Sequence, residues 1–200
     1  MSWKYFKTRD IDKRNLLSLL KNEIPYLQVH NFIDPSLIQS LLRQFQTVGY
    51  DYYESVAPPI GKIGVTVFEN QESSQAYFDE SQRIKKILSL NADEHRKVVD
   101  LLYQELNAKL NLEPMLTRDG NYFAGLIRIM RGGALLHTDY APFDAYQYDI
   151  GQQVLYQIAC NIFLQLPKSG GGHPIVYNRS WNPLDEAEKI VGSMGMRKRW

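Results

Sequence analysis

The sequence predicts one α+β domain in which the helices come first and the strands follow. Apolar residues recur mainly at helical spacing through residues 1–119, whereas apolar and alternating runs bounded by turn residues fill residues 120–181. Helices and strands that are segregated along the chain are typical of the α+β class, with a helical layer against a sheet. The length of 200 residues fits a single domain, and we expect residues 182–200 to form a short helix and a tail.

The first two helices are predicted from apolar spacing and from their end signals. Residues 16–24 form an apolar helical stretch that stops at Pro25, because proline removes a backbone donor and clashes with the preceding turn. Asp34 followed by Pro35 is typical of an N-cap and a first helical residue, and apolar residues then recur at helical spacing up to Gly49. This second helix has the clearest boundaries in the chain.

Two further helices and two short strands complete the first half. One helix covers residues 74–88, and a longer one begins near Asn91 with an apolar residue at every fourth position of one face. Those positions are Val98, Leu102, Leu106 and Leu110. The strands are predicted at residues 26–33 and 61–69, the second because β-branched residues alternate there between two glycines and a polar stretch.

The second half is predicted to consist of strands joined by turns. Four apolar or alternating runs indicate these strands, at residues 126–133, 134–140, 154–167 and 173–181. The glycine run at residues 168–172 lacks the order of a phosphate-binding loop and lies between two predicted strands, so it is predicted to be a hairpin turn.

Composition and charge exclude several classes of protein. The chain carries 23 Lys and Arg against 22 Asp and Glu, a net charge of +1, so it lacks the basic balance typical of proteins that bind nucleic acid or an anionic membrane. The apolar run at residues 154–166 is too short and too often interrupted by polar residues to span a bilayer. A single cysteine, Cys160, and a charged start without an apolar core predict a cytoplasmic protein.

One of the four histidines lies in a pattern typical of metal binding. His30 falls in a predicted strand and His95 among charged residues at a helix start, so we expect surface or capping roles for both. His137 stands two residues before Asp139 in an extended segment, where residues i and i+2 project from the same face. An imidazole nitrogen and a carboxylate oxygen can then bind one ion, as in the 2-His-1-carboxylate sites of non-haem Fe(II) oxygenases.

The residues around this pair carry a family resemblance. The segment LIRIMRGGALLHTDYAPFD is followed by QIACNIFLQLP and then by SGGGHPIVYNRSWNP, with a fainter match at IGVTVFEN and AYFDES. This order resembles the Fe(II)/2-oxoglutarate-dependent oxygenases, and within them the bacterial small-molecule hydroxylases related to the amino-acid and alkaloid halogenases. The resemblance implies N-terminal helices packed on a double-stranded β-helix, which is a cupin-like jelly roll, over about residues 120–183.

The same resemblance implies roles for individual residues. His137 and Asp139 become iron ligands, and 2-oxoglutarate and dioxygen become cosubstrates for the hydroxylation of a small molecule. The halogenases carry glycine or alanine in place of the carboxylate, so Asp139 favours hydroxylation. Arg128 and Arg131 are candidates to bind a carboxylate of 2-oxoglutarate, because a guanidinium binds carboxylates in a planar fork. Asn161 interrupts an apolar strand and is expected to point into the barrel, toward the cosubstrate or a structural partner.

Two features of the family pattern have no evident counterpart in this sequence. The oxygenases complete their triad with a late histidine, followed by an arginine that binds the far carboxylate of 2-oxoglutarate. Downstream of Asp139 the one histidine is His173, in the glycine-rich turn, and it is a weak candidate for the third ligand. We therefore expect a jelly roll that is incomplete at the C-terminus and a 200-residue chain with little or no turnover.

Two alternatives stay open at this point. The first is a non-catalytic metal-binding or scaffold protein of cupin-like fold. The second is a structural α+β domain in which His137 and Asp139 form only a hydrogen bond. No motif in the sequence identifies the substrate or the oligomeric state, because specificity in such barrels resides in loops and in the N-terminal helices.

Overall fold

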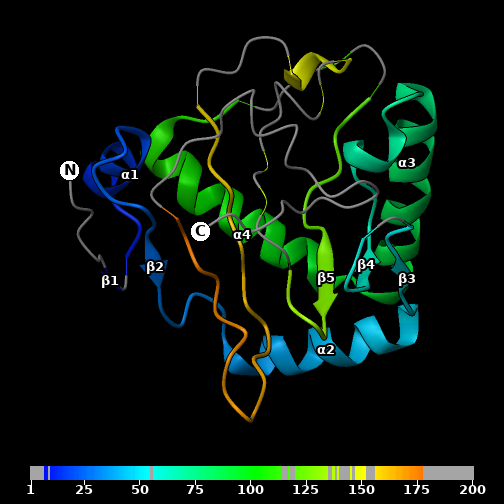
Figure 1. Cartoon of the computed structure of the whole chain (residues 1–200), viewed down its shortest axis with the longest axis horizontal. Helices are drawn as coiled ribbons and strands as arrows, with labels where there is room; N and C mark the ends of the chain where they lie inside the picture. The colour runs from blue at the N-terminus through cyan, green and yellow to red at the C-terminus, as the bar shows by residue number, and fades with distance from the viewer. Residues whose placement is uncertain are drawn as a thin grey trace.

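The computed structural model of this chain describes residues 7–8, 10–54, 56–113, 117, 120–134, 137, 139, 145, 147–151 and 156–177. Within these residues it contains four α-helices, two short 3₁₀-helices and two small β-sheets (Figure 1). This mixture of helix and sheet is compatible with the α+β class, and the described residues form a three-stranded and a two-stranded sheet and not the jelly roll of about eight strands that the resemblance implies.

Four helices are found where the sequence predicts them, but the first ends at Leu20 and not at Pro25, because the chain turns at residues 21–25 and Asn22 has a φ of 57°. They are α1 (Lys13–Leu20), α2 (Pro35–Val48), α3 (Ser74–Asn91) and α4 (Glu94–Leu110). Asp34 caps α2 as predicted, because its carboxylate accepts the backbone N–H of Ser36 at 2.8 Å, and Gly49 ends the helix with a φ of 77°. The predicted start of the last helix near Asn91 is too early, since α3 runs through that residue and α4 begins at Glu94.

The strands form two separate sheets. In the smaller one, β1 (Lys7–Thr8) lies parallel to β2 (Gln28–Val29). In the larger one, β4 (Ile60–Ile63) lies between β3 (Asp51–Tyr52) and β5 (Ile127–Met130), and both pairings are antiparallel. The sheet therefore joins residues that are about 65 positions apart in the sequence, as the pairing of Lys62 with Arg128 illustrates.

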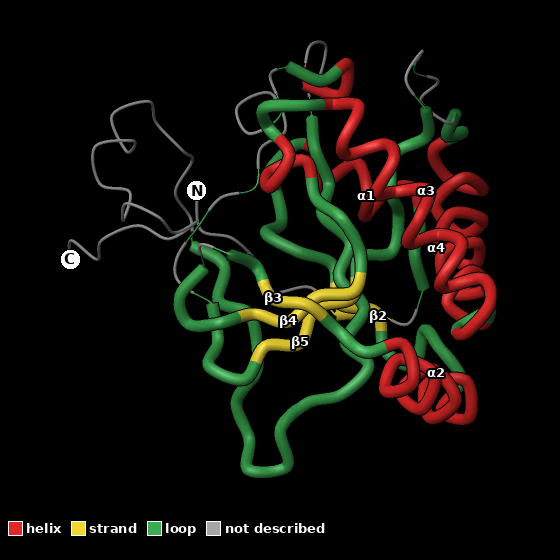
Figure 2. Tube along the Cα trace, turned by 90° about the vertical axis from the view of Figure 1, so that its right-hand side faces the viewer, coloured by secondary structure: helices red, strands yellow, loops and turns green. Residues whose placement is uncertain are grey.

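The larger sheet has one face toward the helices. Ile63 of β4 and Ile127 of β5 point to this helix face and pack in the core with residues of α2, α3 and α4, among them Leu41, Phe45, Ile84, Leu88 and Val98. Figure 2 shows α2, α3 and α4 on one side of the three strands. Lys62 and Arg128 alternate with these isoleucines and therefore point to the opposite face, which we call the polar face.

The predicted strand at residues 61–69 is only partly correct. β4 ends at Ile63, and Val67–Asn70 form the 3₁₀-helix η1. Local side-chain hydrogen bonds explain the change, because Thr66 Oγ1 donates to Glu69 at 2.9 Å and Asn70 Nδ2 donates to the carbonyl of Thr66 at 3.0 Å. Such contacts favour a turn over an extended strand.

The predicted strands after β5 are not found in the described residues. Residues 156–167 and 173–177 form the two arms of a long loop, gold to orange in Figure 1, without sheet pairing in the part of the chain that the structure describes. The predicted turn between them is confirmed, since the N–H of Gly170 donates to the carbonyl of Pro167 at 3.2 Å. Residues 178–200, with the predicted tail helix, lie outside the described residues, as do 135, 136, 138 and 140 of the predicted strand 134–140.

His95 is not the surface residue that the sequence predicts. Its ring lies between Phe45 and Phe123, with ring centroids 6.1 and 6.4 Å away, and its Nε2 lies 2.6 Å from the carbonyl oxygen of Gly125. Burial lowers the pKa of this imidazole, so the neutral form is favoured in the folded protein. Neutral His95 donates Nε2–H to the carbonyl and fixes the segment that leads into β5.

Replacing Gly125 by alanine is expected to destabilise the protein by about 2–4 kcal/mol. Gly125 has a φ of +81°, and an added Cβ would lie 2.5 Å from both His95 Nε2 and Val99 Cγ2, so backbone strain and a steric clash add together. Gly133→Ala is the matched control, because Gly133 has a φ of +78° with nothing within 4 Å of an added Cβ. Urea unfolding of both variants measures the difference, and equal losses of stability would contradict the proposed clash with His95.

None of the helices in the described part of the chain combines the length and the apolar character required to cross a membrane.

Candidate functional site

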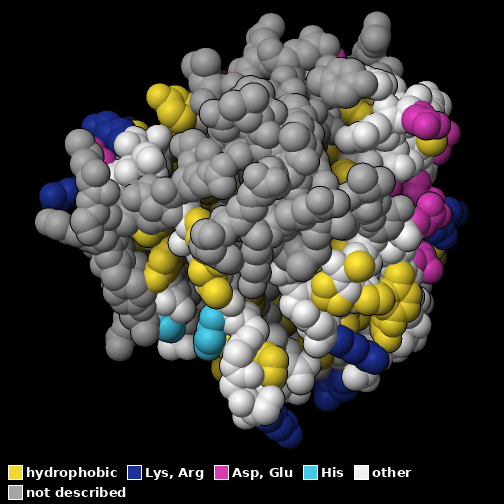
Figure 3. Space-filling model, viewed as in Figure 1, with side chains coloured by type: hydrophobic (Ala, Val, Ile, Leu, Met, Phe, Trp, Pro, Cys, Tyr) yellow, Lys and Arg dark blue, Asp and Glu magenta, His cyan; other side chains and the backbone are white. Residues whose placement is uncertain are grey.

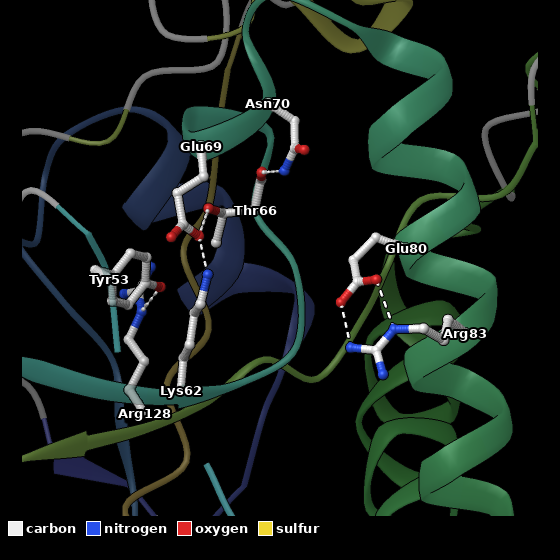
Figure 4. Close-up of polar contacts among 8 residues, drawn as sticks. All are labelled: Tyr53, Lys62, Thr66, Glu69, Asn70, Glu80, Arg83 and Arg128. Carbon is white, nitrogen blue, oxygen red and sulfur yellow. Dashed lines mark hydrogen bonds and ion pairs between the residues drawn. The ribbon is translucent and has the colours of Figure 1, made fainter. Parts of the chain in front are cut away.

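Four side chains form a polar cluster on the polar face of the larger sheet. They are Tyr53, Lys62, Glu69 and Arg128. Lys62 and Arg128 lie directly opposite each other on β4 and β5, and Lys62 forms an ion pair with Glu69 (Figure 4). Both partners of this ion pair are largely buried, so the interaction is screened less by water than a surface pair.

Tyr53 is the buried member of the polar cluster. Only 5% of its surface is exposed, and its hydroxyl accepts a hydrogen bond from Nε of Arg128 at 3.2 Å. The ammonium of Lys62 lies 5.0 Å from the centre of the Tyr53 ring, a distance typical of a cation–π contact. Burial raises the pKa of the Tyr53 phenol, so the hydroxyl is neutral at physiological pH and can accept this hydrogen bond while donating another.

The predicted metal ligands lie close to each other and near the polar cluster. His137 Nε2 and Asp139 Oδ2 are 3.9 Å apart, and their side chains are 31% and 40% exposed. The negative charge of Asp139 is close enough to contribute to the raised pKa of Tyr53, after the larger effect of burial. Gln157 Nε2 donates to the backbone carbonyl of Asp139 at 2.9 Å, so the start of the loop arm at residues 156–167 contacts Asp139.

The His137–Asp139 distance is compatible with a shared ion. Two ligand atoms that each lie about 2.1 Å from one ion are at most about 4.2 Å apart, and about 3 Å apart when they occupy adjacent corners of an octahedron. The observed 3.9 Å is within that limit, and a side-chain movement of about 1 Å would bring the two atoms to adjacent positions. At 3.9 Å the two side chains do not form a direct hydrogen bond.

The structure separates the two candidate arginines. Arg128 joins the polar cluster, whereas Arg131 donates from NH2 to the hydroxyl of Tyr50 at 3.2 Å. The Tyr50 ring lies against Gly61 beside Ile129, on the helix face at the edge of the sheet. Arg131 is therefore directed away from the polar cluster.

Two other candidates do not join the ligand pair. Asn161 is exposed, and the neighbouring Ile162 and Leu164 pack against the helical core, so the predicted inward position of Asn161 is not observed. His173 is also exposed, and the described residues contain no group of three or more His, Cys, Asp or Glu side chains arranged for one metal ion. Within this part of the chain, His137 and Asp139 are brought together without a third ligand.

Sequence reasoning missed Tyr53, Lys62 and Glu69. Lys62 stands in the run GKIG and Tyr53 in DYYES, and neither run resembles a known binding motif. The feature that identifies these residues as neighbours is the antiparallel register, which places Lys62 opposite Arg128 and Tyr53 beside Ile60. That register depends on a pairing between distant segments, so it is not visible in local spacing.

The surface that Figure 3 shows has no single dominant charge. Lys and Arg side chains lie in small separate groups, acidic side chains gather over α3, and apolar side chains gather over the larger sheet. The exposed large apolar residues of the larger sheet and its flanks include Tyr50, Tyr52 and Met130. This distribution on the visible face agrees with the balanced net charge of the sequence.

One curated protein is similar to much of this chain. The chain is 38% identical over 146 residues to Leucinostatins biosynthesis cluster protein S of Purpureocillium lilacinum. The aligned region covers 70% of this chain and 58% of that protein, so the chain spans less than two thirds of the length of this relative. No protein-family model matches the chain, and no solved structure matches it.

Proposed function

We propose that this protein is an Fe(II)- and 2-oxoglutarate-dependent oxygenase that hydroxylates a small molecule. The observation that carries the proposal is the His137–Asp139 pair, whose Nε2 and Oδ2 atoms lie 3.9 Å apart, with the charge of Asp139 acting on the Tyr53 hydroxyl that accepts from Arg128. A metal site of this class needs a carboxylate-binding cation close by, because its cosubstrate is a dicarboxylate. The helices lie on the other side of the sheet, as expected if the sheet is part of a double-stranded β-helix.

The charges around the site support a dianionic ligand. Lys62 and Arg128 are cationic, and Glu69 and Asp139 are anionic, so these four side chains sum to zero. A divalent ion held by neutral His137 and by Asp139 would leave two positive charges, which two carboxylates neutralise. Such neutralisation favours binding of 2-oxoglutarate over neutral molecules, and because Arg128, His137 and Asp139 are exposed, this preference is expected to weaken as the salt concentration rises.

Each residue then has a defined role. His137 and Asp139 hold Fe(II), Arg128 binds a carboxylate of 2-oxoglutarate, and Gln157 fixes the backbone of Asp139 through its 2.9 Å hydrogen bond. Fe(II), 2-oxoglutarate and dioxygen together supply oxidative decarboxylation and hydroxylation of an unactivated C–H bond, with succinate as coproduct. Asp139 fills the position that the halogenases leave for halide, so chloride is not expected in the product.

The relative supports a role in the modification of a natural product. Its name places it in a biosynthesis cluster for leucinostatins, and it is 38% identical to this chain over 146 residues. Enzymes that hydroxylate small molecules are a common class of tailoring enzyme in natural-product biosynthesis. We therefore propose a natural product or one of its precursors as the substrate class.

Anaerobic titration followed by exposure to air tests this proposal. Fe(II) and then 2-oxoglutarate are added to the wild-type protein, and chelation of the metal by the keto acid is expected to produce a visible charge-transfer absorption. After admission of air, succinate is measured by mass spectrometry, with chloride present to check for chlorinated products. Metal binding without any response to 2-oxoglutarate would contradict the oxygenase proposal and favour a metal-binding scaffold, and a chlorinated product would contradict hydroxylation.

A further inference from the structure

We infer that Tyr53 is a positioning residue that fixes the Arg128 guanidinium, so that Arg128 and Lys62 together form a binding site for one carboxylate group. The inference rests on the proposed function for the identity of the ligand, 2-oxoglutarate. Its physical basis, a site for an organic carboxylate on the polar face, stands on the contacts of the polar cluster.

The two cations of the polar cluster are unequally neutralised. Lys62 and Arg128 lie directly opposite each other, and like charges in this arrangement destabilise a sheet unless an anion compensates them. Glu69 is the carboxylate partner of Lys62 and also accepts from Thr66 Oγ1 at 2.9 Å. Among the described residues Arg128 has no carboxylate within ion-pair distance, and its hydrogen bond to Tyr53 is through Nε. The cluster is therefore suited to one further anion beside Arg128.

Tyr53 is held firmly enough to orient its partner. Its backbone N–H donates to the carbonyl of Ile60 at 3.2 Å, which extends the β3–β4 pairing by one residue, and its ring is buried. Because the hydroxyl accepts from Nε of Arg128, and no described residue is hydrogen-bonded to the two terminal nitrogens of the guanidinium, these nitrogens can act as a fork. Paired donation from such a fork is the geometry in which arginine binds carboxylates most strongly.

The same sheet provides a matched control. Tyr50 accepts a hydrogen bond from Arg131 at 3.2 Å, the same distance as between Tyr53 and Arg128. Tyr50 is 39% exposed and lies on the helix face, whereas Lys62 points to the polar face. Removal of either hydroxyl therefore deletes one tyrosine–arginine hydrogen bond, but only Tyr53→Phe alters the inferred carboxylate site.

Calorimetric titration with two ligands tests the inference. Glutarate, which lacks the keto group and cannot chelate a metal as 2-oxoglutarate does, is titrated into the metal-free protein. 2-Oxoglutarate is titrated anaerobically into the Mn(II)-loaded protein. Tyr53→Phe is expected to weaken the affinities for both ligands about three- to tenfold, which is the effect of losing one hydrogen bond. The Mn(II) affinity and the melting temperature of Tyr53→Phe are expected to be close to those of Tyr50→Phe. Where turnover is measurable, KM for 2-oxoglutarate rises and kcat stays unchanged.

The results of these titrations distinguish a failure of this inference from a failure of the proposed function. Equal glutarate affinity in Tyr53→Phe, Tyr50→Phe and wild type overturns the role of Tyr53 and leaves the oxygenase proposal standing. Glutarate binding that depends on Tyr53, in a protein that binds neither Mn(II) nor 2-oxoglutarate at a metal, supports the carboxylate site and overturns the oxygenase proposal. A wild-type protein that does not bind glutarate overturns the inference.

Discussion

Asp139→Ala and His137→Ala are each expected to weaken the binding of Fe(II), or of Co(II) as its substitute, by at least about 100-fold. Loss of a group that merely supports a ligand costs about 10- to 100-fold in metal affinity, and loss of a ligand itself costs at least as much. The effect is large here because the described residues offer only two ligands at this position, 3.9 Å apart. Anaerobic titration followed by Co(II) absorption spectroscopy measures the change.

Two further variants make this result specific. Asp149→Ala removes an exposed carboxylate from the 3₁₀-helix η2 (Asp149–Gly151) and is expected to bind metal as the wild type does. His173→Ala is expected to behave in the same way, because His173 is exposed and is not grouped with the ligand pair. Metal affinities that are equal in the wild type, Asp139→Ala and His137→Ala would show that the metal binds elsewhere, and a loss confined to His173→Ala would identify that histidine as the ligand.

Arg128→Gln is expected to weaken 2-oxoglutarate binding about 10- to 100-fold, whereas Arg131→Gln leaves it within about twofold of wild type. A hydrogen bond between charged groups contributes about 1.5–3 kcal/mol, and Arg128 is the arginine that faces Lys62 and Tyr53. Arg131 donates to Tyr50 on the other side of the sheet and has no contact with the polar cluster. Titration of 2-oxoglutarate into the Mn(II)-loaded variants distinguishes the two.

Protein stability provides the control for the arginine variants. Arg128→Gln removes a positive charge directly opposite Lys62, so its free energy of unfolding is expected to stay within about 0.5 kcal/mol of wild type despite the lost hydrogen bond to Tyr53. Weak 2-oxoglutarate binding in Arg128→Gln is therefore not a consequence of unfolding. If Arg131→Gln shows the larger loss of affinity, the assignment of the carboxylate to the polar face is wrong.

Local chemistry in the sequence determined much of the helical half. Asp34, Pro35 and Gly49 define the ends of α2, because caps and backbone restrictions act over only a few residues. The pairing of His137 with Asp139 is also local, since two residues of spacing suffice to bring their side chains near one another. The α+β class follows from the order of the patterns along the chain.

Only the tertiary structure decided which side chains share a face. Arg128 and Arg131 are equivalent candidates in the sequence, but the β4–β5 register directs Arg128 to Lys62 and Tyr53, and Arg131 contacts Tyr50 instead. The same kind of non-local contact moved His95 from a predicted surface position into a half-buried one, against the Gly125 carbonyl. Strand pairing and core packing join segments that are tens of residues apart, and local patterns carry no information about which partner each segment meets.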